Sequence, residues 1–268
     1  MIAVGPLGIL GGTFDPIHFG HLRLGEEALQ QLSLEQIRFI PAGQPPLRES
    51  PCASAVHRLA MAKLAIAGNP RFEVDEGEVT AAQQSYSVDT LARLRREVGP
   101  TRPLVLLLGT DAFNRLEQWH QWQEIFTLAH IAVANRPQAA DSPVGADETT
   151  ATKTTDETTA QQEGAGQNPA RFAADALKGG RAKDALFAVA DDDTPLECTS
   201  ALASELIQRR GTATDLALAP SGRIVSFTIP ALDISATTIR RLLKAGCPPR
   251  YLVADSVVRY IDLHHLYL

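Results

Sequence analysis

Two histidines, His18 and His21, stand three residues apart in the string GGTFDPIHFGH, which covers residues 11–21. Its Asp15-Pro16 pair predicts a helix start, because Asp caps free backbone N–H groups and Pro suits the first helical position. On such a helix both imidazoles project from one face, near N–H groups and a dipole that favour anions. Two isolated histidines would more often be one surface and one core residue. The whole string, placed after an apolar run, instead favours phosphate binding.

Backbone features at two places also suit phosphate groups. Gly11 and Gly12 let the chain turn sharply and approach a ligand closely, because glycine has no Cβ atom. Ser235 precedes an apolar-periodic segment and predicts a helix N-cap, and Arg240 in the second turn can make a charge-assisted contact. On their own, these two residues would rather indicate a plain capped helix with a solvated arginine.

Three further side chains have types and positions that suit contacts with a small ligand. Asp111 follows the buried run Leu104–Leu108, where a carboxylate can accept from ribose hydroxyls or simply cap a helix. Trp119 offers a flat face on which an aromatic or cationic ring can stack, although a lone Trp is more often core, as we expect for Trp122. Arg136 can hold a phosphate, although a solvated surface arginine is the simpler reading of it alone.

These side chains need a framework that brings distant segments together. Apolar, β-type runs recur at Leu7–Leu10, Ile37–Pro41, Phe72–Val74, Leu104–Leu108, Ile131–Ala134 and Ile224–Ile229. Helix-period segments lie between several of them, at His21–Leu32, Ala55–Ala67, Val88–Val98 and Thr237–Lys244. This alternation predicts an α/β fold, a Rossmann-like doubly wound parallel sheet that binds ligands at the carboxyl ends of its strands.

The segment from Ala139 to about Ser221 interrupts the alternation. It is far longer than the ~12–15 residues of ordinary loops. Residues 147–170 contain almost no aromatic or branched apolar side chains, and we expect them to be disordered, whereas 171–210 can hold one or two short helices. We therefore expect one domain built from residues 1–138 and 222–268, with a partly disordered insertion at 139–221 and closing C-terminal helices.

The composition favours a small-molecule partner. A net charge of -6 and a pI near 5.7 argue against binding to nucleic acid or anionic lipid by non-specific electrostatics. The sequence has neither an apolar run of the ~20 residues that a spanning helix needs nor the marks of a signal peptide, so we expect a cytoplasmic protein. The three cysteines, Cys52, Cys198 and Cys247, form no CxxC pair and are interpreted as reduced and structural.

The string at 11–21 resembles the nucleotidyltransferase superfamily, and its form is similar to that of the nicotinate-nucleotide adenylyltransferases. Further matches occur in order over residues 7–137 and 222–263: FIP with Pro45-Pro46, HRLAM at 57–61, SYSVDTL at 85–91, GTD at 109–111, WHQW at 119–122, NRP at 135–137 and ISATTIR at 234–240. The resemblance implies transfer of the adenylyl group of ATP to nicotinic acid mononucleotide in NAD biosynthesis, giving nicotinic acid adenine dinucleotide and pyrophosphate.

The resemblance also implies roles for individual residues. His18, His21 and Arg240 are the catalytic candidates: the histidines contact the α- and β-phosphates, and Arg240 holds the leaving pyrophosphate with the Ser235 helix start. The ATP-binding candidates are Gly11, Gly12, Thr13, Phe14, Arg48, Asp111, Ser235 and Thr237. The candidates for binding the mononucleotide are Tyr86, Ser87, Trp119, His120 and Arg136. Mg²⁺ is expected to bind mainly through ATP, with no metal site on the protein.

Three departures from the family pattern bear on these roles. Leu47-Arg48 stands where Pro-Pro is often followed by His-Lys, so Arg48 would carry the charge. Ala236 replaces a usual serine, which removes one hydroxyl, and the insertion is unlike compact members of the family. None of these changes touches the histidine pair.

Other interpretations stay open at this point. An adenylyl or cytidylyl transferase acting on another acceptor, such as phosphopantetheine, would not be expected to combine the SYSVDTL, Trp-x-x-Trp and Asn-Arg-Pro strings. A nucleotide-binding protein without turnover is opposed by the intact His18, His21 and Arg240. A zinc site at His18 and His21 lacks nearby Cys or acidic ligands apart from Asp15. The oligomeric state is left open.

Overall fold

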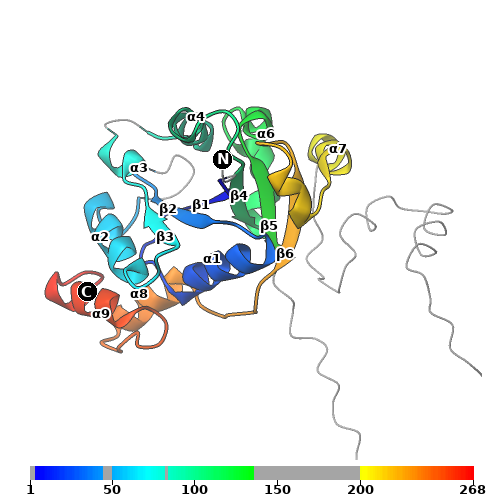
Figure 1. The fold of residues 1–268 in the computed structure, drawn as a ribbon. Coiled ribbons are helices and arrows are strands. Elements are labelled where there is room, and N and C mark those ends of the chain that lie inside the picture. The colour runs from blue at the N-terminus through cyan, green and yellow to red at the C-terminus, as the bar shows by residue number, and fades with distance from the viewer. Residues whose placement is uncertain (1–3, 45–49, 82–83, 136–199) are drawn as a thin grey trace, which may run out of the picture.

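The fold is a parallel sheet with helices on both faces, and the computed structural model describes residues 4–44, 50–81, 84–135 and 200–268 (Figure 1). The strands are β1 (Leu7–Gly12), β2 (Gln36–Pro41), β3 (Phe72–Val74), β4 (Leu104–Gly109), β5 (His130–Asn135) and β6 (Ile224–Thr228). They form a six-stranded sheet in the order β3-β2-β1-β4-β5-β6, and every pair is parallel. The predicted α/β class is confirmed, and each predicted strand ends within two residues of the observed one.

The helices come between and after the strands. They are α1 (Phe19–Gln31), α2 (Ala55–Ile66), α3 (Gly77–Thr80), α4 (Ser87–Val98), α5 (Thr110–Phe113), α6 (Ile125–Leu128), α7 (Ser200–Arg209), α8 (Ala236–Lys244) and α9 (Asp255–Leu263). Short 3₁₀ turns occur at Leu116–Gln118, Trp122–Glu124 and Ala213–Ala217. Within the described residues, every helix is too short or too polar to cross a membrane.

The central strand β1 places the switch point of the sheet. It pairs with β2 on one side and β4 on the other, so the order of strands reverses between β1 and β4. Successive side chains of a strand point to opposite faces, and Ile9 and Leu10 accordingly join different hydrophobic clusters. Ligands of such sheets bind outside the carboxyl ends of the strands at this point, which lies next to Gly12.

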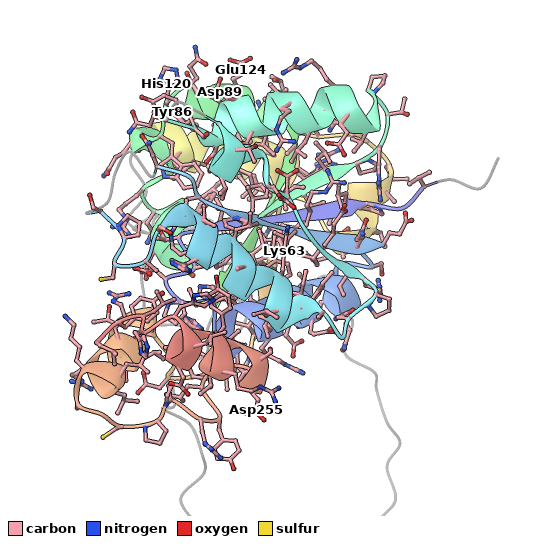
Figure 2. All side chains as sticks on the ribbon, turned by 90° about the vertical axis from the view of Figure 1, so that its left-hand side faces the viewer. Lys63, Tyr86, Asp89, His120, Glu124 and Asp255 are labelled. Atoms are coloured by element: carbon pink, nitrogen blue, oxygen red, sulfur yellow. The ribbon has the colours of Figure 1, made fainter. Side chains whose placement is uncertain are left out.

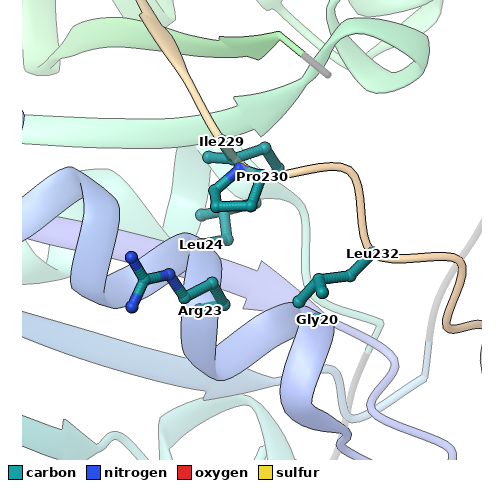
Figure 3. Close-up of a pocket in the computed structure, with 6 residues that line it drawn as sticks. All are labelled: Gly20, Arg23, Leu24, Ile229, Pro230 and Leu232. Carbon is teal, nitrogen blue, oxygen red and sulfur yellow. The ribbon is translucent and has the colours of Figure 1, made fainter. Parts of the chain in front are cut away.

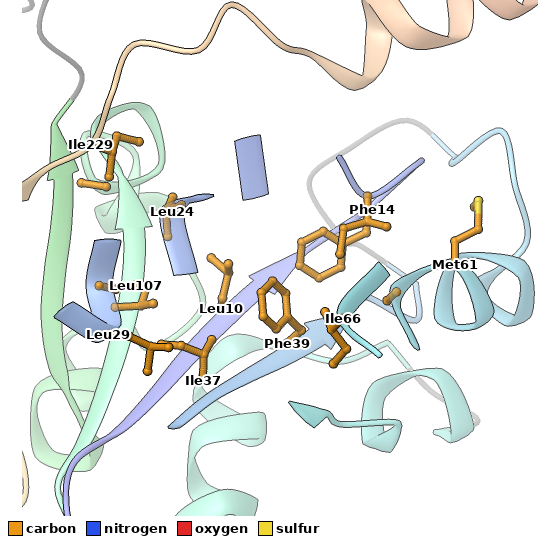
Figure 4. Close-up of a cluster of buried hydrophobic side chains, with 14 of the residues drawn as sticks. Leu10, Phe14, Leu24, Leu29, Ile37, Phe39, Met61, Ile66, Leu107 and Ile229 are labelled. Atoms are coloured by element: carbon orange, nitrogen blue, oxygen red, sulfur yellow. The ribbon is translucent and has the colours of Figure 1, made fainter. Parts of the chain in front are cut away.

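The two faces of the sheet carry separate hydrophobic clusters. One is covered by α1, α2, α8 and α9, and Figure 4 shows its centre around Leu10, Phe14 and Phe39. The other is covered by α4, α6 and α7. Burying each helix's apolar stripe in this way stabilises the sheet and holds each helix against its face.

The predicted insertion at 139–221 falls partly outside the described residues. Residues 139–199, including the stretch 147–170, lie outside the described residues. Residues 200–221 are described, and they pack on the domain: Leu202 and Leu206 of α7 and Leu216 are at most 2% exposed. Residues 200–221 therefore contribute to the core. The boundary of the insertion at residue 221 stays a prediction.

Candidate active site

The string at residues 11–21 forms the connection from β1 to α1 at the switch point. A Cβ atom on Gly12 would lie 2.6 Å from Cε1 of the Phe14 ring, so only glycine fits there. Phe14 has a positive φ of 50° and is 2% exposed, and its ring meets that of His21 edge-on with centroids 5.0 Å apart. The side chain of Phe14 thus supports His21 from the core.

His18 and His21 stack at the start of α1. Their ring centroids are 3.8 Å apart with an interplanar angle of 29°. The two imidazoles lie side by side, although His18 precedes the helix and does not share a helix face with His21. His18 is the N-cap residue, and its backbone N–H donates to Nδ1 of His21 at 3.3 Å. In the neutral imidazole this leaves the proton of His21 on Nε2, which makes that atom a hydrogen-bond donor.

The helix start predicted at Asp15-Pro16 is wrong, because α1 begins at Phe19. The Asp15 carboxylate does not cap this helix. It accepts from the backbone N–H groups of Cys52 at 2.7 Å and Ala53 at 3.1 Å, and from the Tyr267 hydroxyl at 2.7 Å. These donors come from distant parts of the sequence, so the local pattern carries no sign of them.

The second candidate helix start, at α8, meets the first. Ser235 is its N-cap and accepts from the Thr238 backbone N–H at 3.2 Å, as predicted. Arg240 donates to the Asp15 backbone carbonyl at 2.7 Å and to the Thr237 hydroxyl at 3.3 Å. The first turns of α1 and α8, more than 200 residues apart in sequence, therefore share one corner of the molecule.

A close backbone approach joins the two helix starts. A Cβ atom on Gly20 would lie 3.0 Å from the His18 ring and 3.8 Å from the carbonyl of Ile234, the residue before the Ser235 cap. Beside Gly20, a shallow open hollow separates α1 from the segment after β6. Figure 3 shows its lining: Gly20, Arg23, Leu24, Ile229, Pro230 and Leu232. The sequence pattern gives no indication of this hollow, because its walls come from two separate segments.

A third group of candidates gathers at the start of α4. Tyr86 is the N-cap residue of this helix and Ser87 its first residue. The Tyr86 and His120 rings lie 4.5 Å apart at an angle of 37°, and Figure 2 shows both at the same end of the molecule. The structure thus unites two of the predicted mononucleotide-binding residues from segments that are separated by the strand β4.

The remaining candidates differ in how well the structure places them. Asp111 is exposed in α5, directly after β4. Trp119 is half-buried and packs against the second hydrophobic cluster, and Trp122 does the same, in partial agreement with its predicted core position. Arg48 and Arg136 lie outside the described residues, as does Leu47.

Arg58 is a supporting residue to which the sequence pattern assigns no role. Its side chain is 1% exposed, and its guanidinium donates to the carbonyls of Thr13 at 2.6 Å, Gly43 at 3.0 Å and Ala53 at 3.2 Å. Burial lowers the pKa of Arg58, yet an arginine stays charged at neutral pH. Arg58 therefore ties the β1–α1 connection to the loop after β2 and to the start of α2.

The described residues include no cluster of three His, Cys, Asp or Glu side chains that could hold a metal ion. The carboxylate nearest the histidine pair in sequence, that of Asp15, already accepts three hydrogen bonds from protein groups. Mg²⁺ is usually held by one or two carboxylates together with phosphate oxygens. The described part of the chain therefore does not fit a resident metal centre.

Comparison with known proteins identifies relatives over the whole chain. Residues 9–242 match the model of the cytidylyltransferase-like family. A probable nicotinate-nucleotide adenylyltransferase of Dechloromonas aromatica is 43% identical over 98% of this chain and 97% of its own length. A protein of the same name from Acidithiobacillus ferrooxidans is 39% identical over 97% of this chain and 94% of its own.

A solved structure supports the fold. The nicotinic acid mononucleotide adenylyltransferase of Plasmodium falciparum, determined in complex with NaAD, superposes with a TM-score of 0.59. The alignment covers 98% of this chain and 97% of that one at 12% identity. At so low an identity the likeness concerns the fold and not the site.

Proposed function

The chain belongs to the cytidylyltransferase-like family and, within it, to the nicotinate-nucleotide adenylyltransferases, and we propose that its reaction takes place between the starts of α1 and α8. The reaction transfers the adenylyl group of ATP to nicotinic acid mononucleotide and releases pyrophosphate. One observation carries the placement: the stacked His18 and His21 and the Arg240 guanidinium converge around residues 15–21 from opposite ends of the sequence.

The proposed chemistry needs positioned donors and not a protein nucleophile. A phosphate oxygen of the mononucleotide attacks the α-phosphorus of ATP in line. The bond between the α-phosphorus and the oxygen that bridges the α- and β-phosphates breaks, and pyrophosphate leaves. Negative charge on the phosphates is stabilised by donors that are oriented before the reaction. His18 and His21 contact the α- and β-phosphates, and His21 does so through its Nε2–H. Arg240 holds the departing pyrophosphate.

The hollow beside Gly20 is the proposed site of the adenine base. Leu24, Ile229 and Leu232 supply apolar contacts there, beside Arg23, whose guanidinium forms an ion pair with Glu27. Asp111, exposed after β4, is proposed to accept from the ribose hydroxyls, and the backbone at 11–14 to lie along the nucleotide. Thr237, Ser235 and Arg48 complete the proposed set of ATP contacts.

The start of α4 is the proposed site of the nicotinate ring. Tyr86 and His120 offer adjacent rings for stacking, and the first N–H groups of a 12-residue helix favour an anion. The Ser87 hydroxyl adds a donor for the nicotinate carboxylate. Trp119 is proposed to contact the pyridine ring, and Arg136 the mononucleotide phosphate.

Mg²⁺ is proposed to enter as part of the co-substrate, bound to the phosphates of ATP. Since ATP is a cytoplasmic co-substrate, we place the reaction in the cytoplasm.

The experiment that tests the function is product identification. The purified protein is incubated with Mg²⁺, ATP and, in separate reactions, nicotinic acid mononucleotide, nicotinamide mononucleotide and phosphopantetheine. We expect nicotinic acid adenine dinucleotide and equimolar pyrophosphate with the first acceptor. A product formed mainly with phosphopantetheine, or ATP binding without any product, would contradict the proposal.

A further inference from the structure

Asp15 connects four parts of the chain beneath the proposed phosphate site. Its side chain is 5% exposed, and its carboxylate accepts from the backbone of Cys52 and Ala53 and from the Tyr267 hydroxyl. Its backbone carbonyl accepts from Arg240. Because Asp15 is three residues before His18, any shift of its carboxylate is transmitted to the histidine pair and to Arg240 at once.

Tyr267 is the one side-chain hydrogen-bond donor among these contacts to the carboxylate, while the Arg240 guanidinium forms an ion pair with Oδ2 of Asp15 at 3.9 Å. Its hydroxyl oxygen lies 2.7 Å from Oδ1 of Asp15, a short distance for a hydrogen bond to a carboxylate, and the residue is 8% exposed. Burial and the Asp15 carboxylate raise the pKa of Tyr267, so the hydroxyl keeps its proton and stays a donor. The carboxylate thus has a fixed partner over the whole working pH range.

The backbone at Tyr267 is strained. Its φ of +66° lies in the left-handed region, where a bulky side chain is a rare outlier. Such strain persists only where surrounding contacts determine the conformation, and it concentrates near functional sites. The ring packs in the hydrophobic cluster with Phe14, and this packing aims the hydroxyl at Asp15.

We propose that Tyr267 is a positioning residue for adenylyl transfer, which through the Asp15 carboxylate holds the β1–α1 connection so that His18, His21 and Arg240 face the same phosphate groups. This inference rests on the proposed function. Tyr267 itself touches no substrate in this account. Its effect therefore belongs in the rate of the chemical step and not in the affinity for either substrate.

The chain offers a matched control in Tyr260. Its hydroxyl also makes one hydrogen bond, to Nδ1 of His57 at 3.0 Å, and it lies on α9 close to Tyr267 in sequence. Tyr260→Phe and Tyr267→Phe each remove one hydroxyl and leave the ring in place. They differ in that only Tyr267 contacts Asp15.

The test compares steady-state kinetics of the two variants with the wild type. We expect Tyr267→Phe to lower kcat about tenfold or more, since displacing a catalytic group by ~1 Å can cost a hundredfold, with both KM values changed less than about twofold. Tyr260→Phe should keep kcat within about twofold, and both variants should stay folded at the assay temperature, with the larger fall in melting temperature in Tyr267→Phe because its hydrogen bond to a buried carboxylate is the stronger one. Unchanged kcat in Tyr267→Phe, or parallel losses of kcat in both variants, would overturn the proposal.

Two further measurements separate this inference from the proposed function. Hydrogen exchange of the free protein should show faster exchange at residues 13–21 and 52–53 in Tyr267→Phe but not in Tyr260→Phe, whatever reaction the enzyme catalyses. Asp15→Asn should lower kcat too, and adding Tyr267→Phe to it should cause little further loss if both act through one bond. Equal exchange in the two tyrosine variants, or fully additive losses of kcat, would refute the role of Tyr267.

Discussion

Replacing His21 by Asn or by Gln distinguishes the roles of the two nitrogen atoms of its imidazole. The amide oxygen of Asn reaches about as far as Nδ1, so it can still accept from the His18 N–H, a bond that is 3.3 Å long in the structure. No atom of Asn reaches the position of Nε2. Gln has the opposite property, because its terminal NH₂ reaches the position of Nε2 and can donate there.

The magnitude follows from what each variant keeps. Asn preserves the long His18–His21 hydrogen bond but loses the ring contacts with His18 and Phe14, worth about 0.5–1.5 kcal/mol each, so the melting temperature should fall by a few degrees only. Loss of one preorganised donor to a transition-state oxyanion costs about 2.7–4 kcal/mol, which corresponds to a hundredfold to a thousandfold in kcat. We expect that loss in His21→Asn, and a loss of about tenfold in His21→Gln, whose flexible chain positions the donor less well.

The assay is pyrophosphate release at saturating ATP and nicotinic acid mononucleotide, with thermal unfolding of each variant as a control. The same reasoning makes His18→Ala and His21→Ala lose at least about a hundredfold in kcat. If His21→Asn kept the wild-type kcat, or if Gln lost more activity than Asn, His21 would not act through Nε2 and the phosphate role would be refuted.

Three more outcomes are expected. The enzyme should prefer nicotinic acid mononucleotide over nicotinamide mononucleotide on the order of a thousandfold in kcat/KM, because donors near Ser87 would leave the amide with two unmatched groups; equal values would refute the carboxylate contact. Replacing residues 140–199 by a flexible linker of about 15 residues should leave kcat intact, whereas extending the deletion to 221 removes Leu202, Leu206 and Leu216, at ~2–5 kcal/mol each, and should prevent folding; comparable melting temperatures for both deletions would contradict the packing of α7. Finally, burial lowers the pKa of His130, which is 0% exposed, from its usual 6.5, so the unfolded chain takes up the proton first and the stability of the fold decreases as pH drops below about 6.5. Thermal unfolding should show that His130→Ala is less stable than the wild type at pH 7.5 but loses less stability on acidification. An unchanged dependence of stability on pH would exclude His130 as the cause.

The sheet could be predicted from the sequence because its strands are buried on both faces. Runs such as Leu104–Leu108 are continuously apolar, and this composition is what a central parallel strand requires. The start of a helix could also be predicted where a local cap determines it, as Ser235 does for α8. In these segments the local pattern and the final structure follow from the same contacts.

The prediction failed where long-range contacts override a local pattern. Asp15-Pro16 has the composition of a helix start, but the Asp15 carboxylate is occupied by donors from residues 52, 53 and 267, and the helix begins at Phe19. Arg58 and Tyr267 were missed for the same reason. Nothing in their neighbouring residues indicates that their side chains turn inward to hold the β1–α1 connection.

The packing of residues 200–217 shows a second limit. The length of the segment from Ala139 to about Ser221 suggested one insertion that extends to residue 221. Leu202 and Leu206 recur at helical spacing, and this short period was the available sign that the chain had returned to the core.

A crystal structure of the protein with bound nicotinic acid adenine dinucleotide would test the central claim most directly. We expect the pyrophosphate bridge of this product within hydrogen-bond distance of His18 or His21, the adenine in the hollow beside Gly20, and the nicotinate carboxylate at the start of α4. A dinucleotide bound away from the meeting point of α1 and α8 would contradict the account.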